Sequence, residues 1–462
     1  MHQNVIAAIS TPPGKGGVAI IRMSGEGAVS IAKEVFFPLS QKSITDYPSR
    51  TQIYGFVIDN GEKIDDGMLT VFPSPNSYTG EETVEISCHG GVFVTHTVLK
   101  VLFSHGAVPA RAGEFTSRAF INGKLSLTEA EAIGSLLEAT SLEQIILNSE
   151  DARGRLKEYI SHLRREITEI LSSIYARIDY PDEDLGDFTA DECLERLRKI
   201  KASVSRLIRT YRTGHAINEG IPTVIVGKPN VGKSTLYNIL LGDDAAIVTD
   251  IAGTTRDLLE KELTLGRVKL LLTDTAGIRE GDGVDTVEKI GIERTKKRLK
   301  SAELILALFD LSGDIDEVDL ELCRLVSESG GECIAIFTKS DCAKLSADSL
   351  FKDVHFPERL VISRDTAEDT VQRLTELVER MFFDEKISVR TDAVVATARQ
   401  AAALERAAGF IDFAINAYES GLPQDAASSD IELALGAISE LDGRAVAESV
   451  TSAIFSKFCV GK

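Results

Sequence analysis

The residues best suited to chemistry are 227–234, which read Gly-Lys-Pro-Asn-Val-Gly-Lys-Ser. The pattern is that of a phosphate-binding P-loop. Backbone N–H groups of such a loop, and the N-terminus of the helix after it, point at a polyphosphate. A lysine there reaches the β- and γ-phosphates, and the following serine ligates Mg²⁺. We therefore expect nucleotide contacts from Asn230, Val231, Gly232, Lys233, Ser234 and Thr235.

Two downstream segments extend this site toward the terminal phosphate. An apolar run over residues 269–273 ends in Asp-Thr-Ala-Gly, in which Asp274 stands at the position of an outer Mg²⁺ ligand. The N–H of Gly277 can sense a γ-phosphate. A polar loop over residues 253–257 lies between this segment and the P-loop, and its threonines can close on the metal. The contacts expected here are Gly253, Thr254, Thr255, Asp274, Thr275, Ala276 and Gly277.

Two further segments are expected to bind the base. The apolar run over residues 333–337 leads into Thr-Lys-Ser-Asp, which resembles the guanine-reading element N-K-x-D. The Asp341 carboxylate can accept from the N1–H and the exocyclic amine of guanine, although Thr338 replaces the usual Asn. The order and spacing of the nucleotide-binding segments favour guanine as the base, and the departures at Thr338 and Arg364 leave ATP as the alternative nucleotide. The expected contacts are Thr338, Lys339, Ser340, Asp341, Ser363 and Arg364, the last standing where Ala is common.

Ile278 follows the Asp-Thr-Ala-Gly segment directly. Ras-like GTPases carry at this position a glutamine that orients the attacking water. An apolar side chain cannot orient water. Hydrolysis in this protein must therefore recruit another group.

The elements that position these residues follow from hydrophobic periodicity. Residues 220–383 alternate strand and helix, as a parallel α/β sheet requires. Residues 1–122 combine strand-like runs at 18–22, 67–72 and 83–88 with a helix after residue 91. A capping box at Ser126 and Glu129 opens a helical region that extends to residue 177. Further helices are expected over residues 191–211, 391–418, 430–441 and 444–457, so the α/β domain is inserted between two helical segments.

Charge and cysteine content limit the class of protein. The 462 residues carry a net charge of −20, so bulk electrostatics do not favour nucleic acid and a local patch or a partner must hold any RNA. The basic run over residues 294–300 is one candidate, although the solvated face of a helix is the favoured interpretation. Six scattered cysteines without a C-x-x-C pair favour the cytoplasm. No segment is apolar enough to span a membrane or to serve as a signal peptide.

Several segments together resemble the MnmE (TrmE) family of tRNA-modifying GTPases. They are the P-loop with its internal Pro-Asn, residues 247–257, residues 274–280 and the C-terminal Phe-Cys-Val-Gly-Lys; residues 11–17, 75–82, 88–91 and 111–116 agree. The resemblance covers the whole chain. It implies an α+β N-terminal folate-binding domain (1–122) that dimerises, a discontinuous all-α helical domain (123–219 and 384–462) and an inserted α/β Ras-like P-loop G domain (220–383).

The resemblance also implies an activity. The family hydrolyses GTP with stimulation by K⁺. With the FAD-dependent partner MnmG it installs an aminomethyl or carboxymethylaminomethyl group at C5 of the wobble uridine of certain tRNAs. The one-carbon donor is 5,10-methylene-tetrahydrofolate, and 5-formyl-tetrahydrofolate is a related ligand. The implied assembly is a cytoplasmic homodimer that forms a heterotetramer with MnmG.

Individual roles are carried over onto matching positions. Asn230 matches the K⁺ ligand, with Thr249, Ile251 and Thr254 completing that site beside Asp250, Ala252 and Gly253. Ser234 and Thr255 match the Mg²⁺ ligands, and Glu288 matches the glutamate that orients water. The folate-binding positions are Arg22, Glu85, Lys124 and Lys462, and Cys459 supplies a nearby thiol. Without the resemblance, Glu288 and the four folate positions are interpreted as ordinary surface charges.

Two other classes compete with this interpretation. A regulatory or ribosome-assembly GTPase switch shares the nucleotide motifs, but it is expected to carry a basic RNA-binding module such as KH with its G-x-x-G loop. The region after Lys386 contains no such motif and no strong basic excess. A folate-binding protein with a decayed nucleotide domain is the third class, and the intact Lys233, Ser234 and Asp274 argue against it.

Overall fold

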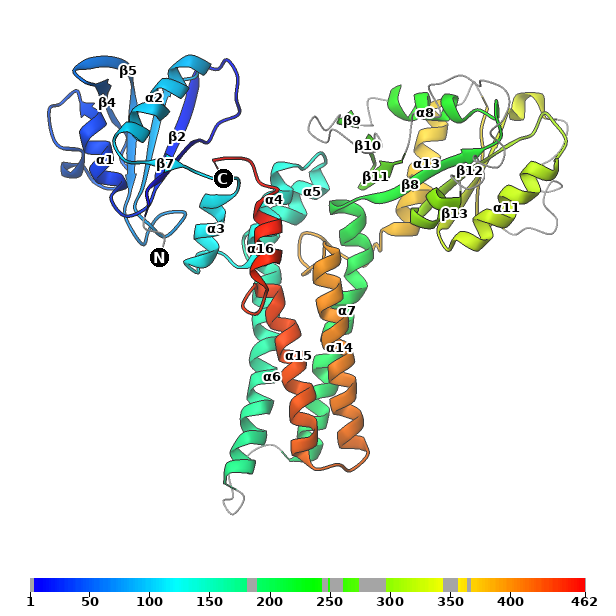
Figure 1. The fold of residues 1–462 in the computed structure, drawn as a ribbon. Helices are drawn as coiled ribbons and strands as arrows, with labels where there is room; N and C mark the ends of the chain where they lie inside the picture. Colours follow the sequence, from blue (N-terminus) through cyan, green and yellow to red (C-terminus); the bar gives the residue numbers. More distant parts are fainter. Residues whose placement is uncertain are drawn as a thin grey trace. The chain divides into compact units, whose positions relative to one another are not determined.

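The structure is a computed structural model that describes residues 4–180, 189–242, 248–249, 261–273, 296–343, 356–363 and 367–461. It divides into two compact units (Figure 1). Unit 1 comprises Met1–Gly134, Asp151–Arg164 and Gly436–Lys462, and unit 2 comprises Ser135–Glu150 and Arg165–Leu435. The three domain boundaries expected from the sequence, after residues 122, 219 and 383, stay a prediction.

A mixed sheet of seven strands forms the N-terminal part of unit 1. Its order is β3 (Phe36–Pro38), β4 (Ile53–Asp59), β5 (Glu62–Phe72), β6 (Thr83–His89), β2 (Val18–Ser24), β1 (Ile6–Ile9) and β7 (Val108–Pro109). All neighbours are antiparallel except β1 and β7. Helices α1 (Ala28–Val35) and α2 (Val92–Ser104) pack on the sheet around one hydrophobic core. The three strands predicted in this region are confirmed.

Short helices complete unit 1. They are α3 (Glu114–Ile121), α4 (Leu127–Leu137) and α16 (Glu448–Phe455). The predicted capping box is confirmed, because the Ser126 N–H donates to Glu129 Oε2 at 2.6 Å and the Glu129 N–H donates to Ser126 Oγ at 3.3 Å. The N-terminus of α3 meets α16 at Gly113, where a Cβ would lie 2.3 Å from the Phe455 carbonyl oxygen. Helix α16 is shorter than the predicted 444–457, since its N-cap residue Ala447 has an extended backbone, with φ −61° and ψ 143°.

The sheet of unit 2 has the order β14 (Glu358–Val361), β13 (Glu332–Thr338), β12 (Leu304–Asp310), β8 (Ile221–Gly227), β11 (Val268–Leu272), β10 (Lys261–Leu265) and β9 (Val248–Thr249). The first five strands are parallel, and β10 is antiparallel to both its neighbours. Alternate side chains of β12 and β13 pack with α8 (Lys233–Gly242) and α13 (Ala367–Phe382) or with α11 (Glu317–Ser329). This two-faced packing confirms the predicted parallel α/β domain.

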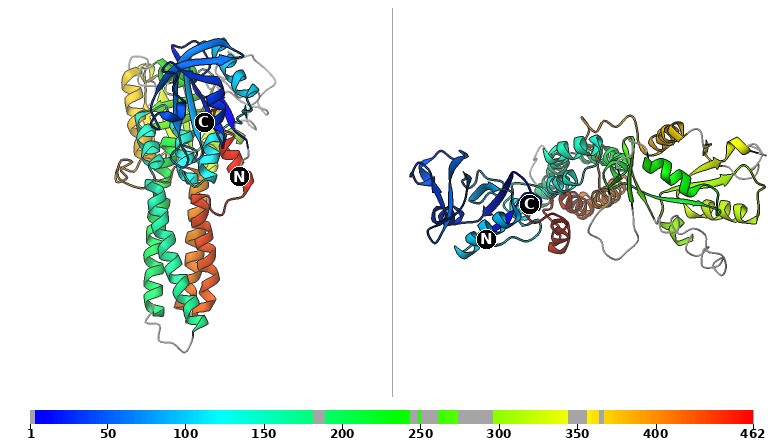
Figure 2. Two further views of the ribbon diagram at one scale, coloured as in Figure 1. Left: turned by 90° about the vertical axis from the view of Figure 1, so that its left-hand side faces the viewer. Right: turned by 90° about the horizontal axis from the view of Figure 1, so that it is seen from above.

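The helical part of unit 2 comes from both sides of that domain in the sequence. Helices α5 (Leu142–Ala152), α6 (Arg155–Asp179) and α7 (Ala190–Asn218) precede it, and α14 (Ala398–Glu419) and α15 (Gln424–Asp442) follow it. Helices α7 and α14 pack along each other, and the unit 2 parts of α6 and α15 run beside them (Figure 2). The predicted pairing of the two helical segments is confirmed.

Other helix boundaries also differ from the prediction, and α15 begins at Gln424 instead of residue 430. Helix α14 begins at Ala398 instead of residue 391, because Thr397 and Gln400 form a capping box and Val395 donates its N–H to Thr210 Oγ1 at 2.9 Å. Helix α7 continues seven residues past the predicted 211 and ends before Gly220, whose φ is +94°. Among the helices of the described chain, none is both long and apolar enough to cross a membrane.

Candidate functional site

The P-loop joins β8 to α8 in the predicted strand–loop–helix order. Gly227, Asn230 and Gly232 have positive φ values of +154°, +60° and +106°. A Cβ on Gly227 would lie 2.8 Å from both the Leu308 carbonyl oxygen and Val231 Cγ1, so the close approach of the strands requires glycine there. The loop therefore has the curled backbone that a polyphosphate needs.

Lys233 lies across this loop. Its Nζ donates to the carbonyl oxygens of Gly227 at 2.9 Å and Lys228 at 2.7 Å. The first N–H groups of α8 have no acceptor within their own helix, as at every helix N-terminus. An ammonium group and these N–H groups thus converge on one loop, an arrangement that fits a phosphate chain.

The predicted base-binding residues follow the next strands of the same sheet. Thr338 ends β13 and is buried, and the short 3-10 helix Ser340–Cys342 presents Asp341 to solvent. The Ser340 N–H donates to the Ile362 carbonyl oxygen at 3.3 Å, which brings Ser363 alongside. Because parallel strands end at one edge of a sheet, P-loop and base-side residues share the carboxyl edge.

Lys339 is paired with a carboxylate at the end of β12. Its backbone is left-handed, with φ +58°, and its Nζ lies 2.5 Å from Asp310 Oδ2. Burial acts to raise the pKa of Asp310, but hydrogen bonds from Lys339 and Ser312 outweigh it and hold that pKa below its ordinary value. The Asp310 carboxylate is therefore ionised at neutral pH, and its contact with Lys339 fixes the loop that carries Asp341.

One contact of the P-loop was missed in the sequence. Lys228 Nζ lies 2.9 Å from Asp316 Oδ2 and 2.6 Å from Asp319 Oδ2, at the N-terminus of α11. Burial acts to lower the pKa of Lys228, and the two carboxylates raise it. The spacing Asp316-x-x-Asp319 before an apolar helical pattern is typical of a capped helix start, and Asp316 is the N-cap of α11. Its pairing with the P-loop depends on the strand order, which the sequence does not state.

Several predicted site residues lie outside the described residues. These are Asp250, Ile251, Ala252, Gly253, Thr254, Thr255, Asp274, Thr275, Ala276, Gly277, Glu288, Arg364 and Lys462. Thr249 is described only as part of the backbone of β9, where it pairs with Glu262. The Mg²⁺ and K⁺ sites and the role of Glu288 therefore stay predictions. Of the basic run, residues 296–300 are helical, with Leu299 buried and the three lysines exposed.

Three of the four predicted folate residues surround one loop of unit 1. Arg22 and Glu85 are direct partners on β2 and β6, and Arg22 Nε lies 2.8 Å from Glu85 Oε1. The Arg22 guanidinium lies 5.7 Å from the ring centroid of Tyr78 and 5.6 Å from that of Phe115. Lys124 Nζ donates to the Pro75 carbonyl oxygen at 3.0 Å, at the start of the loop that carries Tyr78.

The C-terminal tail reaches the same place. Val460 forms an isolated antiparallel bridge with Ala112, and Ser10 Oγ donates to the Gly461 carbonyl oxygen at 3.1 Å. Arg22 lies 3.5 Å from that oxygen. Gly461 has φ +101°, and a Cβ there would lie 2.5 Å from the Ile9 carbonyl oxygen. The tail is therefore seated on unit 1, and its fit requires glycine.

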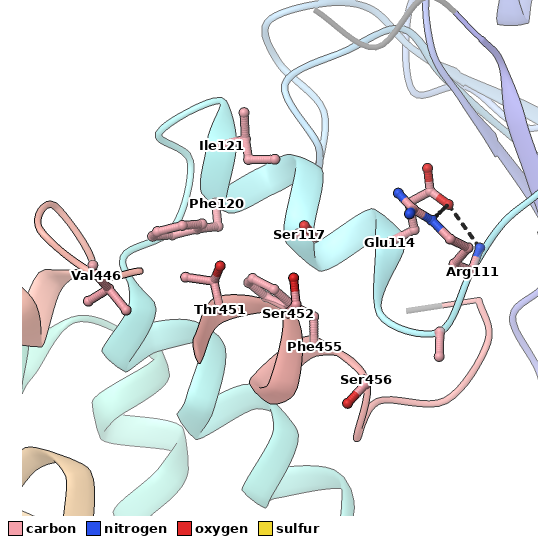
Figure 3. Close-up of a pocket in the computed structure, with 12 residues that line it drawn as sticks. Arg111, Glu114, Ser117, Phe120, Ile121, Val446, Thr451, Ser452, Phe455 and Ser456 are labelled. Atoms are coloured by element: carbon pink, nitrogen blue, oxygen red, sulfur yellow. Dashed lines mark hydrogen bonds and ion pairs between the residues drawn. The ribbon is translucent and has the colours of Figure 1, made fainter. Parts of the chain in front are cut away.

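Two cavities open beside this region of unit 1. Cys459 and the loop over residues 11–16 contribute to one of about 730 Å³. The other, of about 640 Å³, lies between α3 and α16 (Figure 3). Its wall carries Phe120 and Phe455, and Arg111 Nε lies 3.4 Å from Glu114 Oε2 at one end. No motif in the sequence predicts this second cavity.

Comparisons with known proteins agree along the whole chain. Residues 5–124 match the family model of the GTP-binding protein TrmE N-terminus, and residues 127–459 match that of the MnmE helical domain. The tRNA modification GTPase MnmE of Clostridioides difficile is 37% identical over 460 residues, which is 99% of each chain. The protein of the same name from Thermotoga petrophila is 36% identical over 460 residues, 99% of this chain and 100% of its own.

A solved structure matches a smaller part. Era of Aquifex aeolicus bound to GDP·AlF₄⁻ is 27% identical over 41% of this chain and 65% of its own, with a TM-score of 0.26.

Proposed function

The chain belongs to the MnmE family of tRNA modification GTPases, and from this premise we propose the chemistry that its GTP hydrolysis serves. The protein is a K⁺-stimulated GTPase that works with an FAD-dependent MnmG partner. Together they install an aminomethyl or carboxymethylaminomethyl group at C5 of the wobble uridine of certain tRNAs. One observation supports the use of a folate one-carbon donor: the C-terminal tail lies beside the Arg22–Glu85 pair.

The nucleotide part of the proposal assigns roles along the P-loop. Lys233 binds the β- and γ-phosphates, and Ser234 and Thr255 hold Mg²⁺. Asn230, exposed in the middle of the loop, contributes its amide to K⁺ together with Thr249, Ile251 and Thr254. When bound, the cations supply positive charge beside the transferring phosphoryl group. Glu288 orients the water that the apolar Ile278 cannot.

The guanine specificity is assigned to Asp341. Its side chain is exposed at the carboxyl edge of the sheet, where a base can reach it. A carboxylate accepts two hydrogen bonds from guanine, whereas adenine presents no matching pair of donors. Ser340, Ser363 and Arg364 complete the base side of this proposed site.

The folate part rests on the donor groups gathered in unit 1. Glu85 suits the amino and ring N–H groups of a pterin, because an ionised carboxylate accepts from both. Lys124 and Lys462 suit the carboxylates of a glutamate tail. Arg22 is fixed between the Tyr78 and Phe115 rings and the Gly461 carbonyl, which supports a role in ordering the ligand. In this proposal Cys459 supplies a thiol near the bound folate.

The homodimer is proposed through unit 1. Val18, Val92 and Phe93 are large apolar side chains with 66%, 50% and 86% of their surface exposed. Val18 pairs with His89, three residues before Val92, so the three lie close to one another. An exposed apolar cluster of this kind supports association with a second protein surface.

The proposal is tested in cells that lack the protein. Mass analysis of wobble uridines in their tRNA is expected to show loss of the C5 modification. Wild-type protein restores it, whereas Lys233→Ala does not, because the phosphates lose their cationic partner. Unchanged nucleosides in the deletion strain would refute the proposal and favour a regulatory or ribosome-assembly GTPase. Copurification of MnmG in a 2:2 complex tests the partner separately.

A further inference from the structure

Thr338 stands where the guanine-reading element usually has Asn, and its hydroxyl faces the P-loop. Oγ1 donates to the Val231 carbonyl oxygen at 2.7 Å and lies 3.2 Å from the Phe309 carbonyl oxygen. The side chain is 4% exposed. A Cβ built on Gly232 would lie 3.7 Å from Thr338 Cγ2, so the methyl group packs under the same loop.

These contacts leave the hydroxyl in a poor position to read a base. A threonine hydroxyl has one proton to donate, and here a buried carbonyl at short distance takes it. The residue's own carbonyl oxygen accepts from the Leu311 N–H at 3.1 Å, so its backbone is also fixed. Asp341, by contrast, is exposed at the same edge of the sheet. The two residues of the Thr-Lys-Ser-Asp segment thus face different parts of the site.

The loop has a conformation that such a tether can stabilise. Asn230 and Gly232, on either side of Val231, both have positive φ. A non-glycine residue in the left-handed region is conformationally disfavoured, so the surrounding structure must hold it there. Removing the Thr338 hydroxyl would also leave the buried Val231 carbonyl without that hydrogen bond, which destabilises a folded protein.

We propose that Thr338 is a positioning residue that fixes the phosphate-binding loop, and that it does not select the base. The proposal rests on guanine-nucleotide binding at this site, as proposed above. It assigns base selection to Asp341 and loop order to Thr338. The replacement of Asn by Thr therefore keeps guanine specificity, since the residue acts through Val231.

The test compares three variants of the full-length protein. Thr338→Val removes the hydroxyl at nearly constant shape, and Thr338→Ser keeps it. Thr223→Val is the matched control, because Thr223 is a fully buried threonine of β8 whose Oγ1 donates to the Ile221 carbonyl oxygen at 2.8 Å, away from the P-loop. Each variant is titrated with Mg²⁺ and GDP, with 7-deaza-GDP, which lacks N7, and with 6-thio-GDP, which replaces O6.

A positioning role predicts equal losses for all three nucleotides. Thr338→Val is expected to weaken the binding of each nucleotide about tenfold. The affinities of Thr338→Ser should stay within about threefold of wild type, and those of Thr223→Val within about twofold. Hydrogen exchange of the nucleotide-free protein is expected to accelerate over residues 228–234 in Thr338→Val alone. These two results together support the proposal.

Other results overturn it. A loss in Thr338→Val that shrinks for 7-deaza-GDP or 6-thio-GDP would show a contact with the base. Unchanged affinity and unchanged loop exchange would show that the tether has no role. An equal loss in Thr223→Val would show a general effect on the fold. If wild-type protein binds no GDP, the proposed function fails first, which is a distinct outcome.

Discussion

Asn230 illustrates how one residue can serve the backbone and a ligand together. Its φ of +60° falls in the left-handed region, which asparagine tolerates better than most residues. The same position exposes its amide in the middle of the P-loop. The amide is therefore free of a buried structural task and suits the K⁺ contact proposed for it.

We expect Asn230→Ala to abolish stimulation of GTP hydrolysis by K⁺ while nucleotide still binds. Asn230→Gly is the matched control, because it removes the same amide without forcing a Cβ into the left-handed region. Both variants should lose the response, and only the alanine variant should also bind nucleotide somewhat less tightly. Rates measured in KCl and NaCl give the answer. Equal wild-type rates in the two salts would contradict the K⁺ site.

Glu288 is predicted to act only on the attacking water. Glu288→Ala should therefore reduce hydrolysis by at least a hundredfold and leave the affinity for GTP nearly unchanged. Glu288→Gln, which keeps the shape and loses the charge, tests whether a base is needed. Single-turnover hydrolysis and GTP titration measure the two effects separately. A variant that hydrolyses GTP at the wild-type rate would assign the water to another group.

The sequence predicted the chemical roles of single residues better than it predicted which residues they contact. The motif of Lys233 and Ser234 located the loop, and its strand and helix were found as expected. The hydrogen bond from Thr338 could not be predicted from the sequence. Its partner Val231 is 107 positions away, and the two residues come together only because β8, β12 and β13 are neighbours in the sheet. The ion pair of Lys228 with α11 has the same origin.

At the scale of elements, α7 shows how a helix end can be anchored to a sheet. Its last turns pass the start of β12 and β13, where Arg212 forms an ion pair with Glu332. His215 Nδ1 lies 2.8 Å from Glu219 Oε2, and Nε2 lies 3.2 Å from Glu303 Oε1. Periodicity predicted the helix but ended it at residue 211, whereas α7 continues through His215 to Asn218.

The His215 cluster predicts a pH dependence of stability. Burial acts to lower the pKa of His215, but hydrogen bonds with Glu219 and Glu303 outweigh it and raise that pKa to about 9 from an ordinary 6.5. Because the folded-state pKa is the higher one, the stabilisation is complete below pH 6.5 and is lost as the pH rises through 9. Its size is on the order of 3 kcal/mol.

Urea unfolding at pH 7 and pH 9.5 is the measurement, with His215→Gln as the comparison. The wild type should lose about 2–3 kcal/mol more than the variant between these pH values. His96, exposed to solvent on α2 of unit 1 and outside this cluster, supplies the control His96→Gln, which should behave as wild type. A pH dependence identical in wild type and His215→Gln would show that the imidazole remains neutral in the folded protein.

At the scale of the whole molecule, the C-terminal tail contacts the N-terminal strands and loops of the same chain. The contact between Ser10 and Gly461 joins residues 451 positions apart. The sequence predicted such a tail only through the family resemblance, because nothing in Phe-Cys-Val-Gly-Lys itself identifies Ser10, Ile9 or Ala112 as its neighbours. The parallel sheet of unit 2 needed no such help, since strand and helix alternate visibly along residues 220–383.

Removing the tail should separate the two activities of the protein. Deletion of residues 459–462 is expected to weaken binding of 5-formyl-tetrahydrofolate at least tenfold and to abolish tRNA modification. GTP hydrolysis should persist, because the nucleotide residues belong to unit 2 and the tail is seated on unit 1.

Gly461→Ala should reproduce the folate defect, since its Cβ would lie 2.5 Å from the Ile9 carbonyl oxygen at a φ of +101°. Gly61→Ala is the matched control, with φ +83° and open space around the added Cβ. It carries a similar backbone strain in the β4–β5 turn of unit 1, so it should bind folate as wild type does. Titration of 5-formyl-tetrahydrofolate into the four proteins, with GTP hydrolysis measured in parallel, tests the argument. Equal folate affinities in all four would show that the seated tail takes no part in binding the ligand.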